Sequence, residues 1–435
     1  MIKYYLSIII VCLVSGLVAQ VTNIPAPAQS GAILILGAKA HLGDGRVIEN
    51  AAIGFANGKI TLVADATTAR IDRREYREVI DAQGKDVYPG FILPNTATGL
   101  VEVSSLADTD DSSEDGSEFT PNVRAIVAYN TDSEVIPTLR FNGILMAQAT
   151  PAGGVVSGQS TVVQLDAWNW EDAAYRTDDG IHINWPLRQT PPRRFFGETD
   201  PRPNPNYDKH TQLVEGMYRD AIAYGQEAAH ASTNLALAAA QGLFDGSKTL
   251  YIHTDDARSM IESVNLAKQY GVKKIVLIGA AEALLVKDFI KDNNIPVIIE
   301  GIHEVPRRDH EDTVEPYKMA KALHDAGILF GLGSSQGPTR ARNLPFTAGT
   351  CVAYGLPYEE AIKALTGNTA QILGVGDRTG TLEIGKDATL FISQGDALDM
   401  RTNILERAFI QGRQIQLEGR QQFLYKKYSD KYGNK

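Results

Sequence analysis

The stretch that decides the fold is Val87-Tyr88-Pro89-Gly90-Phe91-Ile92-Leu93-Pro94-Asn95-Thr96-Ala97-Thr98-Gly99-Leu100. A short segment with polar bounds leads into a Pro-Gly pair, and an apolar segment then ends on small polar residues. Short apolar runs bounded by turn residues are typical of buried β-strands. The stretch therefore predicts one strand that leads directly into a second, buried strand.

The same stretch resembles the signature of the amidohydrolase superfamily, and most closely that of its imidazolonepropionase-like branch. That signature reads roughly V-x-P-G-[FL]-I-D-x-H-x-H-x-G-[LF], and its frame is present here without gaps. Three positions differ, because Leu93 replaces the aspartate and Asn95 and Ala97 replace the two histidines. The chain thus resembles a metal hydrolase whose first metal ligands are missing.

Other parts of the chain are similar to the same branch. They are a glycine-rich turn at 153–160, a helical pattern at 359–374 and a turn-and-strand pattern at 380–388. The resemblance spans about residues 32–417. It implies an α/β fold in which a (β/α)8 TIM-type barrel is inserted into a small composite β-sandwich formed by both chain ends.

Sequence patterns along the chain agree with this organisation. The Asn57-Gly58 pair between two strand patterns is a strong hairpin signal, because both central residues of such a turn need positive φ. The middle of the chain alternates strand and helix patterns, as a (β/α)8 barrel does. We predict a composite sandwich at 31–90 and 381–420, a barrel at 91–380 and a mobile polar tail at 421–435.

The N-terminus has the pattern of a secretory signal peptide. Lys3 supplies the positive start, residues 6–18 form the apolar run, and Ala19 precedes a plausible cleavage point. A membrane anchor is the alternative, but the run is short for a span of about 20 residues. We therefore predict a signal peptide at 1–19, a linker at 20–30, and export to the periplasm or the extracellular space. Cys351 would then be the one cysteine left, so no internal disulfide is possible.

The net charge of −10 is dispersed over the chain and includes no basic stripe. Nucleic acids and anionic membrane surfaces are therefore not expected as partners. Residues 185–207 are rich in proline and cannot form regular structure over that length. This segment is either a lid over the barrel or a surface excursion, and the sequence leaves both possibilities open.

The resemblance also assigns the positions at which the superfamily holds its metal. These positions are Asn95, Ala97, His253, Gly279 and Ser335 in this chain. A hydrolytic metal needs about three protein ligands and an open position for water. Amide and hydroxyl oxygens are weak donors, and alanine and glycine side chains donate nothing. We therefore predict no metal cofactor, with one divalent ion (Zn, Fe or Mn) as the alternative.

Two rebuilt sites remain possible at the barrel mouth. Ser335 and His253 would form a nucleophile and base, with Asp255 or Asp256 orienting the imidazole. A displaced metal site would instead use His253, Asp255, Glu300 and His303. His182 is interpreted as a satisfied histidine near a strand, without a catalytic role. The predicted pocket is lined by Asn95, Ala97, His253, Gly279, Glu300, His303 and Ser335.

The leading hypothesis is a non-catalytic amidohydrolase homologue. It would bind a small molecule, or pair with a catalytically intact paralogue or with copies of itself. The alternative is a hydrolase of non-peptide or cyclic-amide C–N bonds with a rebuilt or displaced metal site. A purely structural partner subunit is the third hypothesis.

Overall fold

The computed structural model describes residues 24–113, 117–190, 192, 200–227, 230–305 and 312–433. The predicted signal peptide and part of the proline-rich segment lie outside these residues. The chain divides into two units. Residues 25–417 hold both large sheets, and the other unit includes the polar segment that begins at Glu418.

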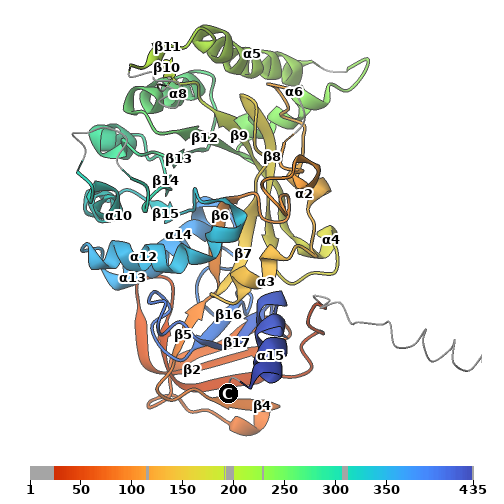
Figure 1. Cartoon of the computed structure of the whole chain (residues 1–435), viewed down its shortest axis with the longest axis vertical. Coiled ribbons are helices and arrows are strands. Elements are labelled where there is room, and N and C mark those ends of the chain that lie inside the picture. Colours follow the sequence, from red (N-terminus) through yellow and green to blue (C-terminus); the bar gives the residue numbers. More distant parts are fainter. Residues whose placement is uncertain are drawn as a thin grey trace, which may run out of the picture. The chain divides into compact units, whose positions relative to one another are not determined.

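The first eight-stranded sheet combines strands from both ends of the chain (Figure 1). Strand β5 pairs antiparallel with β16, so that Pro89 lies opposite Leu390 and the two chain ends form one sheet. The predicted hairpin joins β2 to β3, and both Asn57 and Gly58 have positive φ. The strands are β1 (Ile33–His41), β2 (Val47–Ala56), β3 (Lys59–Asp65), β4 (Glu78–Asp81), β5 (Asp86–Pro89), β16 (Leu390–Ser393), β17 (Leu405–Ile410) and β18 (Arg413–Ile415).

The second eight-stranded sheet forms a nearly closed barrel. Its strands follow one another in chain order from β6 to β15. The two end strands contact each other without a hydrogen-bonded ladder. These strands are β6 (Phe91–Thr96), β7 (Ile144–Ala149), β8 (Val156–Gln164), β9 (Ala174–Asn184), β12 (Thr249–Thr254), β13 (Ile275–Gly279), β14 (Val297–Ile299) and β15 (Phe330–Leu332). The predicted barrel and composite sandwich are thereby confirmed.

Gly90 lies at the junction between the two sheets, after β5 and before β6. A Cβ atom there would lie 2.9 Å from Leu145 Cβ in the barrel and 2.9 Å from Thr389 Cγ2 beside the sandwich. Only a residue without a side chain fits between the two. This close approach explains the Pro-Gly pair of the deciding stretch.

One part of the barrel departs from the alternation that the sequence predicts. Strand β8 runs antiparallel to both β7 and β9. The connection from β7 to β8 is the six-residue segment 150–155, which is too short for the crossover helix that a parallel strand requires. Gly153 and Gly154 take positive φ values of 80° and 61° in this turn. The expectation of regular β/α alternation is therefore wrong at this place.

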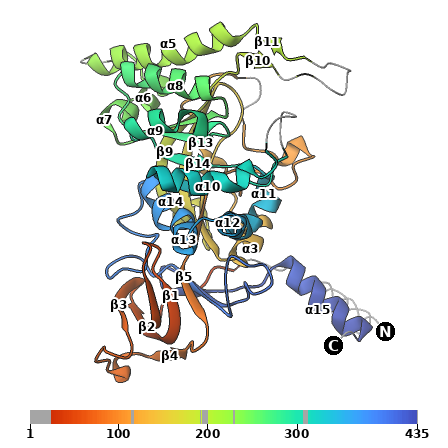
Figure 2. The same ribbon diagram turned by 90° about the vertical axis from the view of Figure 1, so that its left-hand side faces the viewer.

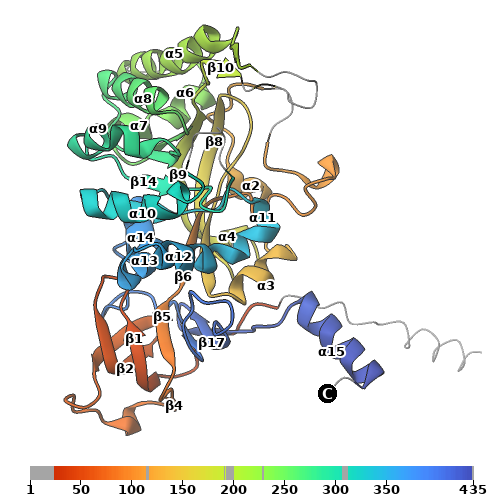
Figure 3. The same cartoon turned by 60° about the vertical axis from the view of Figure 1, so that its left-hand side comes forward.

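Helices cover the outside of the barrel along its parallel strands (Figures 2 and 3). Helix α5 ends at Gln226, and two shorter helices follow it before β12. The longer helices are α5 (Tyr207–Gln226), α8 (Ala257–Gln269), α10 (Glu315–Ala326), α12 (Leu344–Ala353) and α13 (Tyr358–Leu365). The shorter ones are α2 (Ala125–Ala128), α3 (Val135–Arg140), α4 (Trp170–Ala173), α6 (Leu235–Ala240), α7 (Gly242–Asp245), α9 (Lys287–Asp292), α11 (Gly337–Arg340) and α14 (Gly367–Ile372).

The C-terminal segment forms helix α15 (Arg420–Tyr432), none of whose residues is buried. The helix differs from the tail without regular structure that we expect from the sequence. Within the described part of the chain, no helix is both long and apolar enough to cross a bilayer.

Candidate functional site at the barrel mouth

The parallel strands β6, β12, β13, β14 and β15 end at one edge of the barrel, which we call the barrel mouth. Asn95 lies near the end of β6, and its backbone has a positive φ of 47°. Asparagine tolerates this conformation better than most residues do. Its Nδ2 donates a hydrogen bond to Glu300 Oε1 over 2.9 Å. The amide thus connects the first barrel strand to the end of the seventh.

Glu300 follows β14 and turns its carboxyl group into the barrel. Burial raises the pKa of Glu300 to about 7, the Asn95 hydrogen bond opposes this, and the charges of Asp255 and Glu304 add to it. Across from it, a Cβ atom on Gly333 would lie 3.0 Å from Glu300 Oε1. Glycine at this position therefore lets the Glu300 side chain pack directly against the backbone of residue 333.

His253 ends β12, as the resemblance implies, and is hydrogen-bonded to a second histidine. Its Nε2 lies 2.9 Å from His182 Nδ1. Burial lowers the pKa of His253 to about 4, against the opposing charge of Asp255. Burial and the neighbouring His253 hold the pKa of His182 well below its usual value. Both rings are therefore neutral at pH 7, and one donates to the other.

His182 is fully buried in β9, and its ring stacks on Tyr251 with centroids 4.5 Å apart. Its Nε2 has no hydrogen-bond partner among the described residues. From the sequence, we expect this residue to be a satisfied histidine near a strand. Its position by a strand is as expected, but only one of its two nitrogens is satisfied.

Strand β9 also carries a buried acidic side chain, Asp179, which the sequence did not single out. Asp179 is 1% exposed and accepts hydrogen bonds from Tyr251 Oη, Ser160 Oγ and Gln148 Nε2 at 2.7–2.8 Å. Burial raises the pKa of Asp179, and these hydrogen bonds oppose the rise. Gln148 Oε1 in turn accepts from the Asn95 backbone N–H over 3.1 Å. The sequence feature that could have revealed this residue is an aspartate inside a strand pattern. A carboxyl group buried in a strand needs several hydrogen-bond donors around it, and so indicates a polar cluster.

Gly279 ends β13 at a φ of 86°. The neighbouring Asp255 side chain explains why position 279 carries no side chain. A Cβ atom there would lie 2.7 Å from Asp255 Oδ1. That oxygen also accepts a hydrogen bond from the Ala281 backbone N–H over 3.2 Å. Asp255 thus occupies the space that a histidine at position 279 would need.

The remaining predicted residues do not join this group. Ala97 is partly buried and packs against the hydrophobic core. Ser335 is exposed and lines a separate pocket together with His303. Among the described residues, no hydrogen bond joins Ser335 to His253, whose Nε2 faces His182. The structure therefore does not form the nucleophile and base pair that the sequence left open.

Comparison with known proteins places the chain in a family. The profile of the Amidohydrolase family matches residues 225–415. Two relatives of similar length are both named imidazolonepropionase. The one from Brucella anthropi is 24% identical over 373 residues (80% of this chain and 87% of the relative), and the one from Vibrio campbellii is 21% identical over 370 residues (79% and 86%).

The family profile and these relatives support the amidohydrolase superfamily, and within it the imidazolonepropionase-like branch. Solved structures agree in fold. An amidohydrolase from Thermotoga maritima superposes with a TM-score of 0.77 at 22% identity, covering 88% of this chain and 99% of that one. An A. niger ochratoxinase superposes with a TM-score of 0.53 at 14% identity, covering 89% and 96%.

Members of this superfamily usually bind divalent metal ions. The described residues contain no group of three or more His, Cys, Asp or Glu side chains arranged to hold a metal. The Asn95 amide directs its nitrogen to Glu300, and His253 Nε2 is engaged by His182. The donor set of the described chain therefore does not fit a hydrolytic metal.

Proposed function

We propose that this amidohydrolase homologue is exported and binds a small molecule at its barrel mouth without metal-dependent hydrolysis. It would act alone, as a homo-oligomer or as the partner of a catalytically intact paralogue. The observation that carries this proposal is the pairing of side chains at the superfamily's ligand positions. Asn95 bonds to Glu300 over 2.9 Å, and His253 bonds to His182 over 2.9 Å.

This pairing opposes metal binding because of the protonation of Glu300 and the hydrogen bond that His253 would lose. A divalent ion attracts ligands that offer a lone pair or a negative charge. Glu300 carries a proton for about half of the time at neutral pH, since its pKa is about 7. His253 would have to leave His182, which would then be buried with neither nitrogen satisfied. An ion would thus have to break interactions that the apoprotein already makes.

Metal analysis tests the proposal. The protein is purified without chelators, incubated with Zn²⁺, Fe²⁺ or Mn²⁺, desalted, and its metal content is measured by mass spectrometry. We expect far less than one ion per chain, with no difference between the wild-type protein and the His253→Ala variant. About one tightly held ion per chain that His253→Ala releases would overturn the proposal.

A second candidate function rests on Glu300. A buried carboxyl group with a pKa of about 7 has the proton affinity of a general base at neutral pH. The chain would then hydrolyse cyclic-amide or other non-peptide C–N bonds through a rebuilt site. The test is activity on a panel of imidazolones, hydantoins and dipeptides. Turnover that is lost in Glu300→Gln but retained in Ser335→Ala would favour this candidate over the first.

Export and partnership are tested separately. Cell fractionation and N-terminal sequencing would place the mature chain outside the cytoplasm, with Gln20 as its first residue. Purification of the native protein from its own cells would reveal an intact paralogue if the two form a complex. A cytoplasmic protein with an uncleaved N-terminus would contradict the export proposal.

A further inference from the structure

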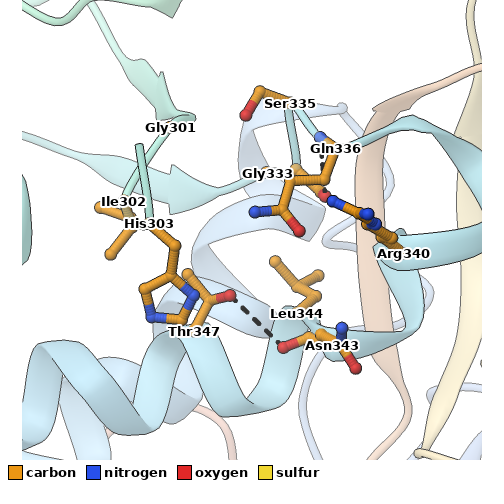
Figure 4. Close-up of a pocket in the computed structure, with 11 residues that line it drawn as sticks. Gly301, Ile302, His303, Gly333, Ser335, Gln336, Arg340, Asn343, Leu344 and Thr347 are labelled. Atoms are coloured by element: carbon orange, nitrogen blue, oxygen red, sulfur yellow. Dashed lines mark hydrogen bonds between the residues drawn. The ribbon is translucent and has the colours of Figure 1, made fainter. Parts of the chain in front are cut away.

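A recess lies between helices α5 and α6, which are neighbours outside the barrel (Figures 1 and 2). Phe119, paired with Val156 at the start of β8, lines its third side. The volume of this α5–α6 recess is about 290 Å³. The pocket beside Ser335 and His303 encloses about 20 Å³, room for a water molecule (Figure 4). Since a cavity of about 150 Å³ can hold benzene, the α5–α6 recess has room for one or two rings.

The floor of the α5–α6 recess is apolar. It is lined by Phe119, Leu213, Met217, Ala236 and Leu237. Met217 is buried, and the phenylalanine and both leucines are partly buried against the hydrophobic core. An aromatic ring and a methionine sulfur both make favourable contacts with a further aromatic ring. The floor therefore favours an apolar, ring-shaped guest.

Gly216 lies within α5 and lines the same recess. Glycine disfavours a helix interior more than any residue except proline. The packing of the described chain does not require it here, because a Cβ atom at 216 would meet only Arg219 Nη2, at 3.6 Å. Gly225 in the same helix differs, since a Cβ atom there would clash with Gln241 Oε1. A guest that approaches the α5 backbone would explain the glycine at position 216.

The charges at the rim of the recess cancel each other. Asp220 lines the recess, and its Oδ1 accepts a hydrogen bond from Arg219 Nε over 3.0 Å. The exposed side chains of Gln212 and Asn234 add uncharged amide groups. An amide can donate a hydrogen bond to a neutral group or accept one from it. The rim therefore favours an uncharged guest that carries a hydroxyl or N–H group.

The apolar surface around the recess is too small for a protein partner. Of the residues of α5 and α6, Leu235 is the one large apolar side chain that is exposed. A specific protein interface covers about 800 Å² on each partner and has an apolar centre. Here the apolar atoms lie inside the recess instead. A concave apolar site with a few polar groups is typical of small-molecule binding.

We propose that the α5–α6 recess binds an uncharged aromatic molecule of one or two rings, such as a phenol or an indole. The ring would lie on Phe119 and Met217 and against the backbone at Gly216. Its hydroxyl or N–H group would reach the amides of Gln212 and Asn234. This site shares no lining residue with the barrel mouth, so it adds a second binding site to the function proposed above.

Calorimetric titration of the purified full chain tests this proposal. The probes are indole and 4-methylphenol, with benzoate and benzylamine as charged analogues. We expect saturable binding of the two uncharged probes at one molecule per chain. The charged analogues should bind about fivefold more weakly or less, because the apolar floor would desolvate their charge. Absence of saturable binding, or equal binding of either charged analogue, would overturn the proposal.

Two leucine variants test the location of the site. Gly216→Leu fills the recess and should weaken binding by about tenfold or more. Its melting temperature should equal or exceed that of wild type, because leucine forms helices far better than glycine. Ala223→Leu is the matched control, since it adds the same side chain at an exposed position of α5 that does not line the recess. It should change binding less than about twofold.

Wild-type affinity in Gly216→Leu, or equal weakening in both leucine variants, would place the guest elsewhere and overturn the proposal. If Gly216→Leu lowers the melting temperature, Gly216→Ala replaces it. The added methyl group should then weaken binding by about threefold or more, and unchanged affinity would contradict the site. Metal content at the barrel mouth does not enter these measurements, so this proposal and the proposed function can fail separately.

Discussion

Glu300 Oε1 accepts a hydrogen bond from Asn95 Nδ2 over 2.9 Å, which joins the end of the seventh barrel strand to that of the first. The ladder of the barrel sheet does not continue between β15 and β6. The pair therefore bridges the barrel mouth at the place where backbone hydrogen bonds are missing. The same carboxyl group is held in a desolvated position where its charged form is unfavourable.

Replacing Glu300 by glutamine should change how stability depends on pH. The carboxyl group has a pKa of about 7 in the folded chain, above its ordinary value of 4.5. The unfolded chain therefore loses this proton first as pH rises, which destabilises the fold between about pH 4.5 and 7. Glu300→Gln should gain stability relative to wild type over that range, by up to about 3 kcal/mol at pH 8. Urea unfolding at pH 4.5 and pH 8 measures the difference, and an equal effect at both pH values would contradict the expectation.

Removal of His253 should destabilise the fold more than removal of Ser335. His253→Ala leaves His182 buried with neither nitrogen bonded, and we expect a loss of about 1–3 kcal/mol. Ser335 is exposed, so Ser335→Ala should stay within about 0.5 kcal/mol of wild type. Thermal and urea unfolding of the two variants give these values. A neutral His253→Ala variant would show that the histidine pair contributes little.

The sequence predicts those parts of the fold that local backbone geometry determines. Asn57-Gly58 forms its hairpin because the turn needs positive φ, and Pro89-Gly90 joins the two sheets because nothing larger fits. The contacts of the site depend instead on residues far apart in the chain. His182 and His253 are separated by 71 positions, and neither carries a local signal for the other.

Two errors have similar physical causes. The reversal of β8 follows from the shortness of the turn before it, and the strand pattern itself does not reveal direction. In the sequence, Asp179 cannot be told from an ordinary polar residue. Only the structure shows that Gln148, Ser160 and Tyr251 donate hydrogen bonds to it. The resemblance placed His253 and Gly279 at the ends of two strands, and they lie at the ends of β12 and β13. It could not identify the side chains that reach those ends from other strands.

His41 connects the sandwich to the barrel, and its contribution should depend on pH. Its Nδ1 lies 2.7 Å from Glu359 on α13, its Nε2 lies 3.4 Å from Asp86, and its ring stacks on Tyr88. Burial alone would lower the pKa of His41, but hydrogen bonds and charges of Asp86 and Glu359 outweigh it and raise that pKa above 6.5.

A raised pKa in the folded chain means that the protonated histidine stabilises the fold. That stabilisation is complete below about pH 6.5 and is lost as pH rises through the higher pKa of the folded chain. His41→Gln should therefore destabilise the protein more at pH 6 than at pH 9. Urea unfolding at the two pH values tests this. His324→Gln, a partly exposed histidine near Glu360, serves as the control and should show a much smaller change.

A side chain at position 279 should destabilise the fold, because Asp255 occupies the space that the side chain would need. Gly279 has a φ of 86°, and a Cβ atom would lie 2.7 Å from Asp255 Oδ1. Gly271 has nearly the same φ, 83°, but a Cβ atom there would meet nothing within 4 Å. Gly271→Ala therefore measures the backbone strain alone, about 1 kcal/mol. Gly279→Ala should cost at least about 1 kcal/mol more, because a clash with Asp255 is added.

Gly279→His, which would introduce the residue that the superfamily has at this position, should be still less stable and bind no metal. Equal losses in the two alanine variants, measured by urea unfolding, would show that Asp255 can move aside. The position would then be open to a ligand histidine.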